Sequence, residues 1–118
     1  MTILQVIMIL ITIESGGDPN AIGDSGKAVG ILQIHQIVVD DVNRIYDTNY
    51  KYSDRYSKEK SIEIAQLYLK HYASEKRLGR KVMVEDVARI WNGGPNGNEK
   101  PATDPYWDKV KAEIQKQK

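Results

Sequence analysis

The chain has 118 residues, with 17 lysines and arginines, 16 aspartates and glutamates, two histidines and no cysteine. At this length we expect a single domain over residues 1–118, with one hydrophobic core and no second binding module. The net charge of +1, with acids and bases interspersed, excludes the basic stripe of a nucleic-acid-binding protein. The absence of cysteine excludes disulfides and thiolate chemistry, and two histidines alone make no metal site, so we expect no metal and no cofactor.

The chain opens with an apolar run that ends in a carboxylate. Within residues 3–13 only Gln5 and Thr12 are polar, and the Ser-Gly-Gly sequence at 15–17 after Glu14 is a helix-stop signal. The run lacks a basic leading segment and a small-residue cleavage site, and it is too short to span a bilayer. We therefore interpret it as the first core helix, with Glu14 on the last turn of a buried helix.

Glu14 is the first candidate for chemistry. An apolar surround and the negative end of a helix dipole both disfavour an ionised carboxylate. A glutamic acid that stays protonated for these reasons can donate a proton to a leaving-group oxygen, as glycosidic bond cleavage requires. Taken alone, a glutamate beside Ser-Gly-Gly is better explained as a solvated helix end, so the interpretation depends on the residues around it.

The next stretch combines turn residues with a short apolar segment. Glycine, aspartate, asparagine and serine cluster over residues 16–26 and predict turns or a small irregular hairpin, in which Asp24 fits an Asx turn. Gly30 would permit close approach of the backbone to a ligand. Gln33 would present an amide suited to the N-acetyl and hydroxyl groups of a neutral sugar, and the alternative for Gln33 is a buried structural hydrogen bond.

The rest of the chain predicts further helices. Apolar residues at helical spacing predict an amphipathic helix over residues 36–46, followed by a tyrosine-rich loop over 47–55. A long helix should run from an N-cap at Ser57 to about residue 78 and end at a glycine. A shorter helix over 84–91 ends at Asn-Gly-Gly-Pro, and Thr103 should cap a final helix.

Four short motifs follow one another along the chain: Glu14-Ser15, Gly30-Ile31-Leu32-Gln33-Ile34, Trp91-Asn92-Gly93-Gly94-Pro95 and Tyr106. Each is weak alone, but the ordered set, which spans most of the chain, resembles the soluble lytic transglycosylase (SLT) domain. That family is related to goose-type lysozymes. The resemblance implies a mainly α, lysozyme-like fold: a helical bundle with a small irregular loop or hairpin lobe beside the cleft.

The resemblance also implies roles for single residues. Glu14 takes the place of the catalytic acid. The substrate-binding positions would be Ser15, Gly30, Gln33, Asn92 and Tyr106. Trp91 departs from the family pattern, which usually has tyrosine there, so Tyr106 becomes the candidate for a hydrogen bond that orients the acid. Asp24 matches the place where goose-type lysozymes carry a second acid that helps to position water.

We therefore expect an enzyme that cleaves the β-1,4 bond between N-acetylmuramic acid and N-acetylglucosamine in peptidoglycan. As in a lytic transglycosylase, Glu14 would act as acid and then base, and the muramic C6 hydroxyl would attack C1 to leave a 1,6-anhydro product. One alternative is a goose-type lysozyme in which water attacks with assistance from Asp24. A further alternative, from another class, is a non-catalytic glycan-binding or phage structural component.

The expected partner is the glycan strand of peptidoglycan, with no nucleic acid and no membrane span, and we expect a monomer. Action at the bacterial cell wall follows from the resemblance, in the periplasm, outside the cell or by delivery from a phage. No signal peptide is evident in the sequence.

Overall fold

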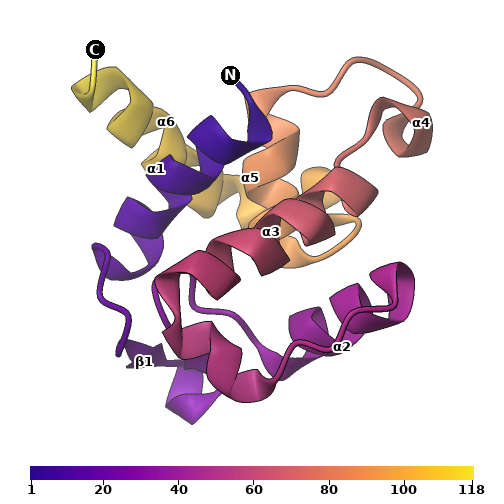
Figure 1. Ribbon diagram of the computed structural model, residues 1–118. Coiled ribbons are helices and arrows are strands. Elements are labelled where there is room, and N and C mark those ends of the chain that lie inside the picture. The colour runs from indigo at the N-terminus through magenta and orange to yellow at the C-terminus, as the bar shows by residue number, and fades with distance from the viewer. The chain divides into compact units, whose positions relative to one another are not determined.

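The computed structural model describes residues 1–118 and is mainly helical (Figure 1). The α-helices are α1 Ile3–Ser15, α2 Gln36–Tyr46, α3 Lys58–Tyr72, α4 Glu75–Leu78, α5 Val84–Gly93 and α6 Asp104–Lys116. Strands β1 (Ile22–Gly23) and β2 (Ala28–Val29) form a small antiparallel hairpin. Short 3-10 helices are η1 Asp24–Gly26, η2 Tyr52–Tyr56, η3 Gly97–Glu99 and η4 Pro101–Thr103. The predicted fold class, mainly α with a small hairpin, is confirmed.

The chain divides into two compact units. Unit 1 comprises residues 1–13 and 69–118, and unit 2 comprises residues 14–68. The boundaries fall within α1 and within α3, and each unit contributes its own set of buried apolar side chains.

In unit 1, α1 is the predicted first core helix, but it is buried on one side only. Five of its side chains are buried: Val6, Ile7, Ile9, Leu10 and Ile11. Leu4, Met8 and Thr12 are exposed, because residues four apart lie on one face of a helix. The predicted core helix is thus present, and its burial is limited to the face that carries these five side chains.

The long helix predicted up to residue 78 is interrupted in unit 1. α3 ends at Tyr72, and α4 begins at Glu75. Between them Ser74 takes an extended conformation, and its hydroxyl accepts a hydrogen bond from the N–H of Arg77 at 3.1 Å. A serine that caps a new helix in this way competes with continuation of the old one. The stop at Gly79, which has φ +73°, is confirmed.

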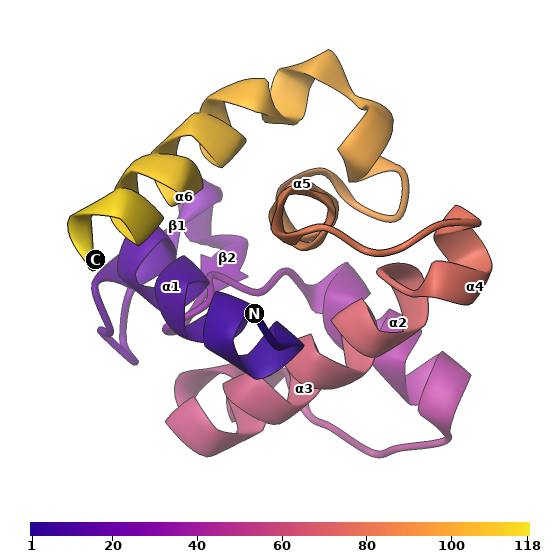
Figure 2. The ribbon, with the colours of Figure 1, turned by 90° about the horizontal axis from the view of Figure 1, so that it is seen from above.

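The C-terminal part of unit 1 is built from α5 and α6. Figure 2 looks nearly along the axis of α5, around which η3 and η4 lead into α6. Thr103 precedes α6, as predicted, but its side chain does not cap that helix. Its buried hydroxyl oxygen instead accepts from Nε of Arg89 and lies 2.7 Å from the carbonyl oxygen of Gly97. The predicted capping bond is therefore wrong, because tertiary partners use the hydroxyl.

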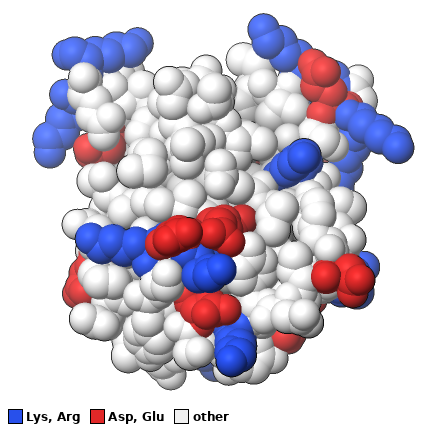
Figure 3. Space-filling view, in the orientation of Figure 1, with Lys and Arg blue, Asp and Glu red and all other residues white.

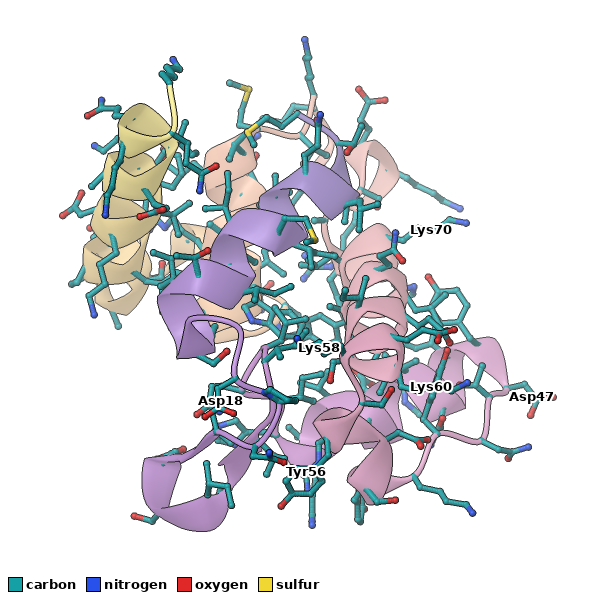
Figure 4. All side chains as sticks on the ribbon, turned by 60° about the vertical axis from the view of Figure 1, so that its left-hand side comes forward. Asp18, Asp47, Tyr56, Lys58, Lys60 and Lys70 are labelled. Atoms are coloured by element: carbon teal, nitrogen blue, oxygen red, sulfur yellow. The ribbon has the colours of Figure 1, made fainter.

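Unit 2 contains the hairpin, α2, η2 and the first part of α3. Its buried apolar residues are Ala28, Val29, Ile31, Leu32, Ile34, Val39, Val42, Ile64, Ala65 and Tyr68. The predicted amphipathic helix over 36–46 is confirmed as α2, and Asp47, which follows its last residue, has φ +54° (Figure 4). The tyrosine-rich segment predicted as a loop ends in the short helix η2.

The surface carries charges of both signs. On the face shown in Figure 3, acidic and basic side chains lie interspersed, in keeping with the net charge of +1. None of the helices combines the length and the apolar character needed to cross a membrane.

Candidate active site

Glu14 lies on the last turn of α1, as predicted, and it is half-buried. The helix ends directly after it because Gly16 and Gly17 adopt φ values of +66° and +92°, which glycine tolerates at no steric cost. In the loop that follows, Asp18 (labelled in Figure 4) accepts a hydrogen bond from the N–H of Asn20 at 2.9 Å. This bond makes an Asx turn that leads the chain toward β1.

Ser15 fastens the end of α1 to the glycine-apolar-glutamine segment. Its hydroxyl donates to the carbonyl oxygen of Ile31 at 2.8 Å and accepts from the N–H of Gly17 at 3.0 Å. Two motifs that lie far apart in sequence therefore meet next to Glu14. The hydroxyl proton is already used within the protein, so a role for Ser15 in binding substrate stays a prediction.

Gln33 makes hydrogen bonds within the hairpin region through its side chain. Its side-chain N–H groups donate to the carbonyl oxygens of Ala21 and Gly30, both at 3.0 Å. The side-chain amide oxygen of Gln33 lies against Gly23, where an added Cβ would overlap it. The residue itself has φ +52°, a conformation that is rare outside glycine and is held here by these bonds. The structural hydrogen bond weighed for Gln33 is thus present, and only the amide oxygen remains to accept from a ligand.

Gly30 is buried and has φ +85°. The close approach predicted for it is real, but its partner is the protein: an added Cβ would overlap the main-chain carbonyl oxygen of Arg55. Its N–H donates to the carbonyl oxygen of Ala21 at 2.8 Å. Approach to a ligand at Gly30 stays a prediction.

Asp24 lies in the hairpin turn with φ +50°. Its side chain is 63% exposed, and its Oδ2 lies 3.2 Å from Nε2 of His35. This contact joins the hairpin turn to the residue that precedes α2. The carboxylate therefore pairs with a histidine rather than making the predicted Asx-turn hydrogen bond.

Two predicted substrate-binding residues belong to unit 1. Asn92 is exposed on the last turn of α5, and Tyr106 is buried on the first turn of α6. α5 runs two residues beyond the predicted range 84–91 and ends within the predicted Asn-Gly-Gly-Pro stop, where Gly94 has φ +87°. The remaining candidates lie in unit 2.

Sequence reasoning missed Arg55, which it left at the end of a loop. The residue is only 7% exposed. Its guanidinium donates to three main-chain carbonyl oxygens, those of Lys27, Ile34 and Tyr52. No local pattern marks such a residue, because its acceptors are spread over distant parts of the chain. No group of three or more histidine, aspartate or glutamate side chains that could hold a metal ion occurs in residues 1–118.

Comparisons with known proteins agree with the order of the motifs. The family model of the transglycosylase SLT domain matches residues 2–112. Among solved structures, the chain is similar to a chain in the crystal structure of Aeromonas hydrophila PliI in complex with Meretrix lusoria lysozyme. That similarity has a TM-score of 0.75 and 29% identity, and it covers 92% of this chain and 87% of the other.

The comparison with curated proteins gave no match. The family match nevertheless extends over almost the whole chain, and the structural match agrees with a lysozyme-like fold. The chain therefore belongs to the transglycosylase SLT domain family, whose domain cleaves the peptidoglycan of the cell wall.

Proposed function

We propose that residues 1–118 form one catalytic domain of a lytic transglycosylase, with Glu14 as general acid and then general base. The observation that carries this proposal is the hydrogen bond from the Ser15 hydroxyl to the carbonyl oxygen of Ile31. It holds the helix end that bears Glu14 against the glycine-apolar-glutamine segment. A catalytic acid has to be held at a fixed place in this way if it is to meet a leaving-group oxygen.

The proposed reaction needs one carboxyl group. Protonated Glu14 gives its proton to the oxygen of the β-1,4 bond, and the bond from that oxygen to the muramic C1 breaks through an oxocarbenium-like state. The Glu14 carboxylate then takes the proton of the muramic C6 hydroxyl while O6 attacks C1. Glu14 ends protonated again, and the product carries a 1,6-anhydro ring.

The substrate-binding residues are proposed on the family resemblance, and the structure narrows what they can offer. They are Ser15, Gly30, Gln33, Asn92 and Tyr106. Gln33 would accept a hydrogen bond through its amide oxygen, because both amide protons are used inside the protein. Asn92 is exposed and has a full amide to present.

The pairing of Asp24 supports the transglycosylase over the goose-type hydrolase. A second acid that positions water needs an oxygen directed to that water. In this chain Oδ2 of Asp24 lies 3.2 Å from Nε2 of His35 at the exposed hairpin turn. The second-acid role therefore has no support beyond the matching place in sequence.

The test is mass spectrometry of the fragments that the protein releases from purified peptidoglycan. We compare wild type with Glu14→Gln, Asp24→Asn and a matched loop control, Asp18→Asn. Anhydro products from all except Glu14→Gln are expected. Reducing muramic ends that are lost in Asp24→Asn would instead make the protein a lysozyme. No release by wild type would overturn the enzyme and favour a glycan-binding or phage structural component.

A further inference from the structure

Unit 2 contains a cavity of about 350 Å³ between the hairpin turn, the start of α2 and η2. Its lining residues are Gly26, Lys27, His35, Gln36, Ile37 and Arg55. Two of them carry a positive charge, a third gains one when protonated, and none is acidic. A hollow with this lining favours a negatively charged ligand.

Arg55 is the buried side of this cavity, and its charge has no carboxylate partner. Its Nε donates to the carbonyl oxygen of Tyr52 at 2.8 Å. Its Nη1 donates to Ile34 at 2.9 Å and to Lys27 at 3.3 Å, again at carbonyl oxygens. These acceptors are neutral, whereas buried arginines are seldom found without a negative partner.

The second terminal nitrogen of Arg55, Nη2, is not used by the fold. Nη2 makes no hydrogen bond within the protein, and no buried side-chain nitrogen lacks a partner. Nη2 is therefore in contact with solvent. Arg55 is one of the residues that line the cavity, and Nη2 is the donor of its side chain that the fold leaves unused.

The N-terminus of α2 adds to the positive potential of the cavity, and one carboxylate near the cavity reduces it. The cavity lies at the N-terminus of α2, where unpaired backbone N–H groups favour anions. The carboxylate of Asp24 contacts His35 at 3.2 Å and reduces the charge on that side. The carboxylate of Asp40 is bound to the hydroxyl of Tyr52. Lys27 and Arg55 have no acidic partner of their own.

An apolar side chain completes the lining. Ile37 is 73% exposed although it is a large hydrophobic residue. A carboxylate that carries a small apolar group beside it would contact Ile37 with that group and the cations with its oxygens. The end of a short peptide has this chemistry, whereas an inorganic anion offers nothing to Ile37.

We propose that this cavity binds a free carboxylate of the peptide that decorates the glycan strand, through Nη2 of Arg55 and Nζ of Lys27. The inference rests on the proposed function, since it names a second part of the same substrate. It makes the chain select strands that carry peptides with a free carboxylate.

The first experiment measures binding without catalysis. N-acetyl-dialanine and its C-terminal amide are titrated into the full chain while backbone amide chemical shifts are recorded. Shifts at residues 26, 27, 36 and 37 are expected with the acid. The affinity for the amide should be about fivefold lower than the affinity for the acid. Equal response to the acid, the amide and inorganic phosphate, or none at these residues, would overturn the proposal.

Variants then assign the donors. Lys27→Gln should weaken binding of the acid by about two- to fivefold, as for one exposed ionic contact. The matched control is Lys60→Gln, which should leave binding unchanged. Lys60 lies on α3 (Figure 4) over the ring of Tyr50 and does not line the cavity. Binding by Arg55→Gln is interpreted only if circular dichroism shows that this variant is folded. If the variant is not folded, Lys27→Gln alone tests the proposal.

A kinetic comparison separates failure of this inference from failure of the proposed function. Initial rates are measured on glycan strands with their peptides and on strands stripped of them. Lys27→Gln should raise KM on decorated strands by about threefold more than on stripped strands. Cleavage of both by wild type without this difference overturns the inference alone. No cleavage of either overturns the proposed function, while the titration still reports on the cavity.

Discussion

Each unit contains a largely buried arginine whose main-chain carbonyl oxygen packs against a glycine. In unit 2 Gly30 lies against the carbonyl oxygen of Arg55, and in unit 1 Gly97 lies against that of Arg89. In both places an added Cβ would overlap the oxygen. The two units therefore use the same local device, a glycine that lets two backbone segments touch.

The side chains of the two arginines differ in their partners. Arg89 donates to the carboxylate of Glu85 at 2.7 Å and to the hydroxyl of Thr103, and it forms an ion pair with the carboxylate of Asp104 at 3.0 Å. Arg55 donates to neutral carbonyls only. A count of hydrogen bonds would rate them alike, whereas the balance of charge separates them. Arg89 is neutralised within unit 1, and the charge of Arg55 remains available to a ligand.

Replacing the two glycines should have the largest effect on stability. Gly30→Ala and Gly97→Ala should each lower the free energy of unfolding by more than about 3 kcal/mol, because a carbonyl oxygen occupies the place of the new methyl group. Urea denaturation followed by circular dichroism measures this. Gly26→Ala is the control, since Gly26 has φ +90° but nothing within 4 Å of an added Cβ, and it should cost only about 1–2 kcal/mol. Equal losses at Gly30 and Gly26 would contradict the steric explanation.

The next largest effect on stability comes from replacing Arg55 or Arg89, and its salt dependence should differ between the two. Arg55→Met should cost about 2–3 kcal/mol, because the carbonyl oxygen of Ile34 loses its charged donor in a buried place. This cost should be the same in low salt and in 1 M salt. The cost of Arg89→Met should fall with salt, since its partners Glu85 and Asp104 are well exposed. The same salt dependence at both sites would remove the distinction.

Asp86 extends the comparison to pH within unit 1. Hydrogen bonds from Arg80 at 2.7 Å lower the pKa of the Asp86 carboxyl, against the opposing effect of burial. A depressed pKa stabilises the fold above the unfolded value of about 4, and this contribution is lost as pH falls through the folded value. Asp86→Asn should therefore cost about 2 kcal/mol at pH 7 and progressively less below about pH 4. Denaturation of both proteins at pH 7 and pH 3 measures the change, and a constant difference would contradict it.

The smallest expected effect on stability is at Asp104, an exposed ion-pair partner of Arg89. Asp104→Asn removes an ion pair whose carboxylate side chain is exposed, so the loss should be about 0.5 kcal/mol at low salt and close to zero at high salt. Thermal unfolding in both conditions measures it. A loss as large as that of Asp86→Asn would show that unit 1 depends on Asp104 far more than its exposure suggests.

Much of the secondary structure could be predicted because its signals are local. Periodic apolar residues and the glycines after residues 15 and 93 are enough to place α1, α2 and α5, and the glycine after residue 78 marks the end of α4. Two of the errors arose where a hydroxyl had a choice of partner. Ser74 caps a new helix, and Thr103 bonds to Arg89 instead of capping α6. Local sequence does not distinguish these outcomes, because the competing partner at Thr103 comes from another element.

The candidate site could be predicted as a set of motifs but not as a set of contacts. The order of the motifs led to the family, and the place of Glu14 at a helix end was correct. The amide of Gln33 bonds to backbone, and Gly30 approaches Arg55, neither of which the motif specifies. Arg55 carries no sequence signal, since its acceptors lie at residues 27, 34 and 52.

The division of the chain also bears on the order of folding. Unit 2 is one continuous stretch, residues 14–68, whereas unit 1 joins the first thirteen residues to the last part of the chain. Contacts near in sequence close at a lower entropic cost and form faster than contacts across a long connection. During synthesis, unit 2 can assemble while residues 69–118 are still being added, whereas α1 waits for its partners in unit 1. The nascent chain therefore exposes the apolar residues of α1 until residues 69–118 have been added.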